Sequence, residues 1–395
     1  MSELLHIQKY LLDHDYTDLL AEFGVEYRKN PDLPLVILDY NMYLIPSSKK
    51  DHPIVRECRG ITLDSRDHSL VAKSFDRFFN YGEITNEPFD FNDFIVQSKE
   101  DGSLIKIYYF ENRWYINTRF SFGTGRCCDS EISWETAVLQ ALGLDSPNEL
   151  DRLLDRRFTY ICEFCSPLNR VVREYKEPLV FLLSIFDGIK ELPFKECENE
   201  NRIFRRPEVY HFGSVDEILK FLDSKEESDP TFEGFVVRDR NNNRLKIKNK
   251  AYLKLSYYFG KSVGYHPRHL IVLVHDGDKD ELLTYYPSIK PAYEAVKEKV
   301  EKHLEILWSF YRENVHKDKR TFHESVVKVP LYSILESLYK QKGESATTDD
   351  LFQIWIQNED KVLKELFGVA GAEHNLRHKT NYQTMQKRNR SNGKM

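Results

Sequence analysis

The sequence predicts an α+β fold in which antiparallel β-sheets with flanking helices are followed by an all-helical domain. From about residue 54 to residue 254 the apolar residues fall in short runs, many alternating with period two and separated by turn residues. Beyond about residue 257 they recur at spacings of three and four, which is typical of amphipathic helices. A content of 41% hydrophobic and 30% charged residues is that of a globular chain, and 395 residues suffice for two or three domains.

Within the β-rich part, residues 104–118 predict a hairpin with apolar alternation on both arms. Leu179–Phe186 is the longest apolar stretch, but it is less than half of the about 20 residues that a bilayer crossing needs. It therefore predicts a buried strand and not a membrane span. One helix is expected between the strands, where Ser146 and Glu149 have the spacing of a capping box. We expect the body of this helix over residues 149–156.

The helical domain is predicted from three segments. The first has one apolar face, formed by Val296, Val300, Leu304, Leu307 and Tyr311. A second helix is expected after Pro330. Thr348 is expected to cap a third helix that continues through Leu366. These segments divide the chain into residues 1–255, a helical domain at 256–373 and a basic tail at 374–395.

The tail carries lysine and arginine without acidic residues, which predicts a disordered end. The whole chain has a formal net charge of −6, so any contact with nucleic acid must come from local basic patches. The first residues carry an acid where a signal peptide needs a base, which indicates a cytoplasmic protein. Six cysteines are too few for a disulfide scaffold, and we expect them to be structural thiols.

A candidate nucleophile stands at the end of a predicted strand. Lys99 precedes Asp101 and Gly102, and Asp-Gly is also a common turn, so the pattern by itself does not establish chemistry. A lysine that attacks must first lose its proton, which requires burial or nearby positive charge. Lys246 and Lys248 are two residues apart on a predicted strand and share one face. We therefore expect them to lower the pKa of Lys99 and to hold phosphates.

Two carboxylates stand among aromatic and β-branched residues on strands that read as buried. Glu163 and Glu233 would each cost several kcal/mol if they were buried without a partner. A metal ion, a ribose hydroxyl or a lysine would satisfy either one, and a structural salt bridge is the alternative. Arg59, Arg77 and Arg119 lie on or beside strands, where a surface ion pair is the ordinary role of a single arginine.

In this order, the motifs resemble those of the covalent nucleotidyltransferases, and most closely the bacteriophage RNA ligase 1 family. Residues 99–104 (KEDGSL) match the nucleophile motif, 163–170 (EFCSPLNR) the ribose-contacting motif, 233–237 (EGFVV) the fourth motif and 246–248 (KIK) the fifth. All four stand in the family's sequence order. The resemblance covers about residues 35 to 368 and implies a nucleotidyltransferase (ligase) fold in the first domain.

The resemblance implies roles for individual residues. Lys99 is the implied catalytic nucleophile. The implied ATP-binding residues are Tyr40, Arg59, Arg77, Lys99, Gly102, Arg119, Glu163, Lys246 and Lys248. The implied metal-binding residues are Glu233, Glu163 and Asp101, with Asp280 and Glu281 as candidates for a second metal. Arg77 and Arg119 stand where the family more often has lysine, and a planar guanidinium is not equivalent to an ammonium group.

The implied activity is an ATP-dependent RNA ligase that joins 5′-phosphate and 3′-hydroxyl RNA ends. Lys99 would receive AMP from ATP, pass it to the RNA 5′-phosphate and release it when the strand is sealed. Mg²⁺ is the expected cofactor, with Mn²⁺ as a substitute. RNA or tRNA repair alongside an end-healing kinase or phosphatase is the expected setting, and the helical domain is expected to select the RNA.

Two alternatives remain at this stage. A DNA ligase or capping enzyme usually appends a β-barrel after the fifth motif, whereas this sequence turns helical. An RNA-binding protein with a retired active site would be expected to lack the nucleophile or a phosphate-binding lysine, and Lys99, Lys246 and Lys248 are all present.

Overall fold

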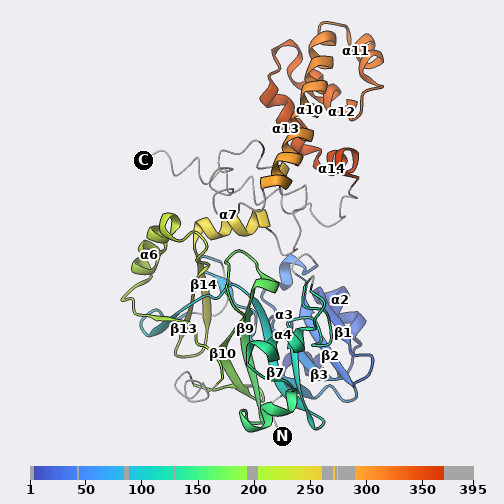
Figure 1. Cartoon of the computed structure of the whole chain (residues 1–395). Helices are drawn as coiled ribbons and strands as arrows, with labels where there is room; N and C mark the ends of the chain where they lie inside the picture. The colour runs from blue at the N-terminus through green and yellow to red at the C-terminus, as the bar shows by residue number, and fades with distance from the viewer. Residues whose placement is uncertain are drawn as a thin grey trace. The chain divides into compact units, whose positions relative to one another are not determined.

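The computed structural model describes residues 4–41, 44–83, 89–128, 130–193, 203–259, 270–271, 274 and 290–368. The chain divides into two compact units, residues 1–263 and 264–395 (Figure 1). In the part that the structure describes, all three β-sheets belong to the first unit and the second unit is helical. The predicted α+β fold class is confirmed.

The first sheet has four antiparallel strands in the order β1-β2-β3-β4. Strand β2 is buried on both faces: Val36 packs with the helices of the N-terminal segment, whereas Ile37 packs with Phe122 on the opposite face. The elements are α1 (His6–Tyr10), α2 (Tyr16–Phe23), β1 (Val25–Lys29), β2 (Leu35–Tyr40), η1 (Ser47–Lys49), α3 (Pro53–Glu57), β3 (Arg59–Asp64) and β4 (Leu70–Ala72).

The second sheet has five antiparallel strands in the order β11-β10-β9-β7-β8. The predicted hairpin is formed by β7 and β8, which turn through Glu111 and Asn112 at positive φ. The predicted strand at 179–186 is β10, and all cysteines that the structure describes are free thiols. The elements are β7 (Ser103–Phe110), β8 (Arg113–Thr118), α4 (Trp134–Ala141), η2 (Pro147–Arg152), β9 (Phe158–Cys165), η3 (Pro167–Asn169), β10 (Leu179–Asp187) and β11 (Lys190–Glu191).

The third sheet has the order β12-β6-β13-β14-β5, in which β14 and β5 are parallel and the other pairs antiparallel. Helix α6 buries Ile218 and Leu222 against Val96 and Phe235 on one face of this sheet. The elements are β5 (Phe79–Asn80), β6 (Phe94–Ser98), β12 (Val209–Tyr210), α6 (Val215–Ser228), β13 (Gly234–Asp239), β14 (Arg244–Lys248) and α7 (Lys250–Phe259).

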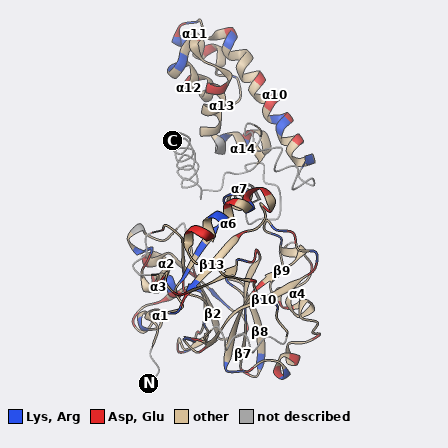
Figure 2. Cartoon of the chain, turned by 90° about the vertical axis from the view of Figure 1, so that its left-hand side faces the viewer, with Lys and Arg blue, Asp and Glu red and all other residues tan. Residues whose placement is uncertain are grey.

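The second unit contains the predicted amphipathic helices. The predicted face of α10 is confirmed, except that Leu304 is half-buried and His303 is buried beside it. Figure 2 shows lysine, arginine and acidic residues along α10 and α11. The elements are α10 (Lys290–Asn314), α11 (Lys319–Val326), α12 (Tyr332–Lys342), η5 (Gly343–Ser345), α13 (Thr348–Gln357) and α14 (Glu359–Phe367).

Two predicted helix details are wrong. The segment capped by Ser146 has the expected capping box with Glu149, but it is a 3₁₀-helix that ends at Arg152, because the chain enters β9 a few residues later. Helix α13, the third helix that the sequence predicted, is capped by Thr347 and not by Thr348. The Thr347 hydroxyl accepts from the Asp350 amide, and the Asp350 carboxylate accepts from the Thr347 amide. That helix also stops before residue 358 and restarts as α14.

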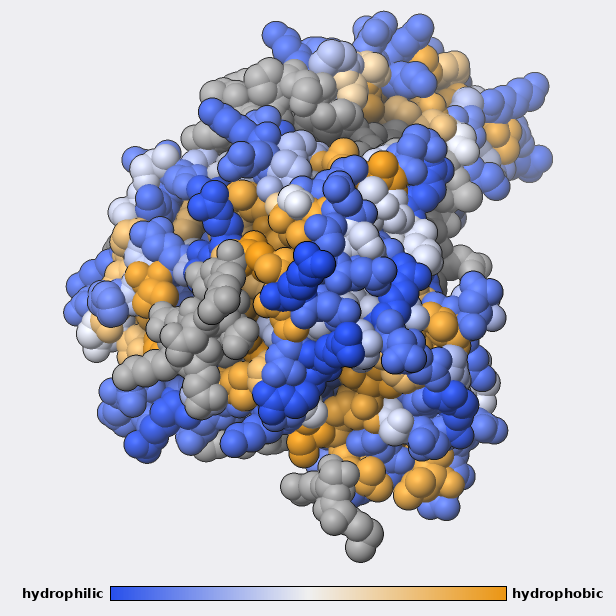
Figure 3. Space-filling model, turned by 60° about the horizontal axis from the view of Figure 1, so that its bottom comes forward, coloured by the Kyte–Doolittle hydropathy of each residue, from blue (hydrophilic) through white to orange (hydrophobic). Residues whose placement is uncertain are grey.

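In the described part of the chain, no helix combines the length and apolar composition that a bilayer crossing requires. The face drawn in Figure 3 is mostly hydrophilic, with hydrophobic residues in several areas between the hydrophilic ones.

Lys106 joins the first and second sheets. It lies in β7, is fully buried, and its ammonium nitrogen donates to the Gly60 carbonyl and, at 2.7 Å, to the Thr62 hydroxyl of β3. Burial lowers the pKa of Lys106 to about 7. Nothing in the sequence distinguishes this residue, because a lysine in the middle of a strand usually lies on an exposed face.

Replacing Lys106 should change how stability depends on pH. A lysine whose pKa is near 7 when folded and about 10.4 when unfolded makes the free energy of unfolding rise with pH between these values. Lys106→Met should reduce this slope by about 1 kcal/mol per pH unit, measured by urea unfolding at pH 7, 8 and 9. The exposed Lys220→Met is the matched control, and equal slopes in both variants would contradict the shifted pKa.

Candidate active site

Lys99 follows the last residue of β6 and is fixed at both its backbone and its side chain. Its amide donates to the Gly234 carbonyl at 2.8 Å, which ties the end of β6 to the start of β13. Its ammonium nitrogen lies 2.8 Å from Oε2 of Glu233. The predicted nucleophile and one predicted carboxylate are therefore in direct contact.

Glu233 bridges two lysines. Its second oxygen, Oε1, lies 2.8 Å from the ammonium nitrogen of Lys248, and the side chain is only 4% exposed. Burial favours the neutral carboxyl, but the charges of Lys99 and Lys248 outweigh it and hold the pKa of Glu233 below its usual range. A buried carboxylate that carries charge between two ammonium groups is the centre of the site.

The prediction that neighbouring lysines lower the pKa of Lys99 is wrong. Burial does favour the neutral amine, but Glu233, Glu163 and Asp101 favour the ammonium and together raise the pKa of Lys99. The sequence showed the lysines on one face of a strand, but it did not show that the carboxylate of Glu233 lies between them. Lys99 is thus an ion-paired ammonium here.

Close backbone packing explains two glycines of the site. Gly234 has φ +128, and a Cβ atom there would lie 2.2 Å from the Ile247 carbonyl of β14. A Cβ atom on Gly102 would lie 2.3 Å from the Phe164 carbonyl of β9. Both glycines let the strand ends that carry Lys99 and Glu233 approach their neighbours, and ATP binding by Gly102 stays a prediction.

Glu163 lies on β9 opposite Leu104 of β7. Burial raises its pKa to about 7, with Lys99 opposing this shift and Glu233 adding to it. Glu163 and Glu233 therefore differ, since Glu233 is ion-paired and charged whereas Glu163 takes up a proton near neutral pH. A cation or a hydrogen-bonding hydroxyl beside Glu163 would favour its charged form.

Asp101 is held by other parts of the chain. Its Oδ2 accepts from the amides of Val172 and Arg173 at 2.8 and 2.6 Å, and its Oδ1 accepts from the Tyr252 hydroxyl at 2.6 Å. Burial raises the pKa of Asp101, and the charge of Glu233 adds to the effect. Both oxygens thus fix the turn after Lys99 to the segment around residue 172 and to α7.

Metal binding by Glu233, Glu163 and Asp101 stays a prediction. Among the residues that the structure describes, no three histidine, cysteine or acidic side chains form a group that could hold a metal ion by themselves. Asp280 and Glu281 lie outside the described residues.

Lys246 and Arg59 lie on the same aromatic ring. The Lys246 ammonium and the Arg59 guanidinium are each 5.2 Å from the centroid of Phe78. Burial, and then the charge of Arg59, lowers the pKa of Lys246 to about 7. Burial together with Arg119 lowers the pKa of Arg59. Holding these positive charges close together costs free energy, which a bound anion would offset.

Tyr40, Arg77 and Arg119 form a second group. The guanidinium carbons of Arg77 and Arg119 lie 5.2 and 4.5 Å from the Tyr40 ring centroid. Arg119 also pairs with Asp39 at 2.8 Å, and Asp39 faces Arg59 across the β2–β3 register. The two groups of cations therefore meet at Arg59.

The structure brings together most of the predicted residues in one region of the first unit, but it also adds residues. Tyr252 and Asp39 each bind a predicted site residue directly. Asp39 stands next to Tyr40 in the sequence and could have been considered for that reason. Tyr252 gave no signal, because nothing local indicates that α7 folds back onto the turn at Asp101.

Comparison with known proteins adds independent information. A family model described as RNA ligase matches residues 57–259. A protein of Autographa californica nuclear polyhedrosis virus, named as a bifunctional polynucleotide kinase/RNA ligase, is 33% identical over 304 residues. This match covers 73% of the chain and 42% of the viral protein, so the chain spans less than half of that relative.

Two further similarities are more distant. A protein of Thermovibrio ammonificans named as an RNA ligase is 27% identical over 274 residues, covering 66% of this chain and 67% of that protein. An archaeal ATP-dependent RNA ligase of known structure has a TM-score of 0.44 and 14% identity, and the match covers 75% of this chain and 78% of that one.

Proposed function

The chain belongs to the T4 RNA ligase 1 family, which confirms the resemblance seen in its motifs, and from this we propose that it is an ATP-dependent RNA ligase. The observation that supports the proposal best is the contact of Lys99 with Glu233, which also contacts Lys248. A lysine nucleophile, a buried carboxylate and a row of phosphate-binding cations are what nucleotidyl transfer requires.

We propose that Lys99 attacks the α-phosphate of ATP, forming a nitrogen–phosphorus bond while the bond to pyrophosphate breaks. Lys99 must first release its proton to water, and it does so more readily when Glu233 no longer acts as its counter-ion. Lys246, Lys248 and Arg59 supply positive charge where the pyrophosphate develops negative charge. Arg77 and Arg119 extend this charge toward Tyr40 and are proposed triphosphate contacts.

We propose that a divalent cation binds at Glu233 and Glu163. The charge of Glu233 opposes the ionisation of Glu163, and carboxylate oxygens are the ligands that Mg²⁺ prefers. When bound there, Mg²⁺ or Mn²⁺ would neutralise phosphate charge and favour the ionised carboxylates. Asp101 is proposed to act indirectly, by fixing the turn after Lys99. Glu163 is also proposed to contact the ribose of ATP.

We propose that AMP then passes to an RNA 5′-phosphate and is released when a 3′-hydroxyl attacks. RNA repair, including repair of tRNA, is the proposed setting. The viral relative is named for kinase and ligase activity together, so a partner that phosphorylates RNA 5′ ends is proposed as well. Sealing of 5′-hydroxyl RNA should require an added polynucleotide kinase, and sealing without one would contradict the need for this partner.

The test of the proposed function is incubation of the protein with a divalent cation and ATP labelled at the α-phosphate. A denaturing gel and peptide mapping should place the label on Lys99, and added 5′-phosphorylated RNA should remove it. If a folded, nucleotide-free protein acquires no label, it is a binding protein that has lost its catalytic step.

Loss of a phosphate-binding lysine should slow adenylylation. Lys248→Ala removes one of the two ammonium groups that contact Glu233, and with it a proposed phosphate contact. The rate of lysyl-AMP formation should therefore fall by about 100-fold. Lys250→Ala, two residues along, is the matched control because this lysine is 70% exposed and pairs with Asp223. Equal rates in the two variants, measured by single-turnover labelling, would remove Lys248 from the site.

We propose that the helical unit selects the RNA and that the domain boundary lies near the division at residue 263. Removing residues 264–395 should leave the rate of lysyl-AMP formation within about threefold of the intact chain, because Lys99 and its contacts lie in the first unit. Discrimination among RNA substrates should decrease. Unchanged relative rates for a broken tRNA loop and an unstructured RNA would contradict the proposed role.

A further inference from the structure

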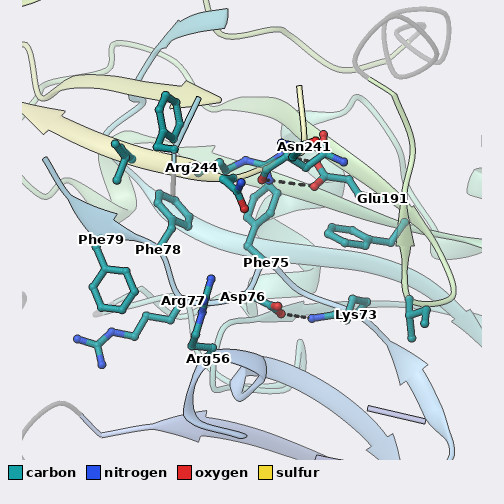
Figure 4. A pocket seen from close by; sticks show the side chains of 16 residues that line it. Arg56, Lys73, Phe75, Asp76, Arg77, Phe78, Phe79, Glu191, Asn241 and Arg244 are labelled. Atoms are coloured by element: carbon teal, nitrogen blue, oxygen red, sulfur yellow. Dashed lines mark hydrogen bonds and ion pairs between the residues drawn. The ribbon is translucent and has the colours of Figure 1, made fainter. Parts of the chain in front are cut away.

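A pocket of about 330 Å³ lies on the first unit and contains neither Lys99 nor Glu233 among its lining residues (Figure 4). Arg244 pairs with Glu191 on one side of Phe75, and Lys73 pairs with Asp76 on the other side. Of its lining residues only Arg77 has a proposed role with ATP, so that role does not account for the rest of the pocket.

The lining combines positive charge, aromatic rings and amides. Four cationic side chains face two acidic ones in a chain whose net charge is −6, so the pocket is locally basic. Phenylalanines form much of its wall, and the Arg244 guanidinium lies 4.4 Å from the Phe75 ring centroid. Three consecutive amide side chains, residues 241–243, also line it. Aromatic and guanidinium planes with nearby hydrogen-bonding groups are the features that bind unpaired nucleotides.

Strand β14 connects this pocket to the candidate active site. Its residues at alternate positions share one face: Lys248 contacts Glu233, Lys246 lies over Phe78, and Arg244 lies over Phe75 in the pocket. Four residues of strand span about 13 Å, which sets the separation of the pocket from the Glu233 pair. Phe78 forms part of the pocket wall, and its ring also contacts Lys246 and Arg59. The pocket therefore adjoins the cations proposed to hold phosphates.

We propose that this pocket binds the terminal nucleotide of a single-stranded RNA, which is the nucleotide that carries the reacting group. This inference rests on the proposed ligase function and names where its RNA substrate lies. The base packs among the phenylalanine and guanidinium planes, and the backbone phosphate lies toward the row of cations on β14. The Asn241 amide contacts the base edge, because the side chains of Asn242 and Asn243 already bond to Arg238 and Asp239. The nucleotide belongs either to the strand with the 5′-phosphate or to the strand with the 3′-hydroxyl.

Ile189 provides a variant that changes the pocket with little effect on the fold, because it lines the pocket and is 40% exposed. Ile189→Glu places a carboxylate at the rim and should raise the Kd for a fluorescent single-stranded RNA of ten nucleotides, measured by anisotropy, by about tenfold. Leu12→Glu, at a side chain that is 66% exposed elsewhere in the first unit, should leave the Kd within about twofold. The rate of lysyl-AMP formation from ATP should be equal in the wild type and both variants.

Two substrates distinguish the strands. A raised KM for a 5′-phosphorylated RNA in AMP transfer assigns the pocket to that strand, and a raised KM for the 3′-hydroxyl strand in sealing of pre-adenylylated RNA assigns it to the other. If Ile189→Glu leaves the Kd for RNA unchanged, or raises the KM for ATP instead, the pocket is not an RNA site. Failure of the proposed ligase function would show separately as wild-type protein without lysyl-AMP, while the anisotropy measurement would still test the pocket.

Discussion

Lys99→Ala should lower lysyl-AMP formation by at least about a thousandfold, because no other group at this position can form the bond to the α-phosphate. Sealing of an RNA that already carries 5′-linked AMP should persist, since that step needs the cations and Glu233 but no new bond to Lys99. Labelling with α-phosphate-labelled ATP measures the first step, and ligation of pre-adenylylated RNA measures the last. The contrast between the two rates identifies the role of Lys99.

The fold should tolerate this substitution, because Glu233 keeps its ion pair with Lys248 at 2.8 Å. Lys220→Ala, on the exposed face of α6, is the matched control and should retain both activities. Loss of both steps in Lys99→Ala with an unchanged unfolding transition would show that Lys99 has more than a nucleophilic role. Normal labelling of Lys99→Ala would remove it from the reaction.

The sequence predicted the parts of this fold that depend on local patterns. The β7–β8 hairpin was predicted from alternation, and the face of α10 was predicted from residues three and four apart. The break between α13 and α14 was missed, because the apolar spacing continues across Asn358 while the helix does not. Periodicity gives the face of a helix but not where its hydrogen bonds end.

The candidate site shows the same division. The order of the motifs predicted that Lys99, Glu163, Glu233, Lys246 and Lys248 belong together. The direction of the pKa shift of Lys99 could not be predicted, because it depends on whether a carboxylate or an ammonium lies nearer to its side chain. Tyr252, which donates to Asp101 from α7, and the buried Lys106 were missed because their partners are distant in sequence.

Glu233→Gln should have the other large effect. The amide keeps the size of the side chain but removes the charge that Lys99 and Lys248 share, leaving two ammonium groups near Lys246 and Arg59 without their counter-ion. Breaking a buried ion pair by removing one partner typically costs about 3 kcal/mol or more, so urea unfolding should show a loss of this order. Lysyl-AMP formation should fall by about 100-fold, because a neutral amide no longer favours a bound divalent cation.

The pH dependence separates this ion pair from a simple packing effect. The folded pKa of Glu233 lies below its unfolded value of about 4.3, so its charge contributes stability above that pH and loses this contribution as the pH falls through the folded pKa. The stability difference between wild type and Glu233→Gln should therefore be full at pH 6 and shrink in acid. The exposed Glu227→Gln should show no such difference at either pH. A stability difference for Glu233→Gln that stayed constant into acid would mean that the carboxylate is not held in its charged form by Lys99 and Lys248.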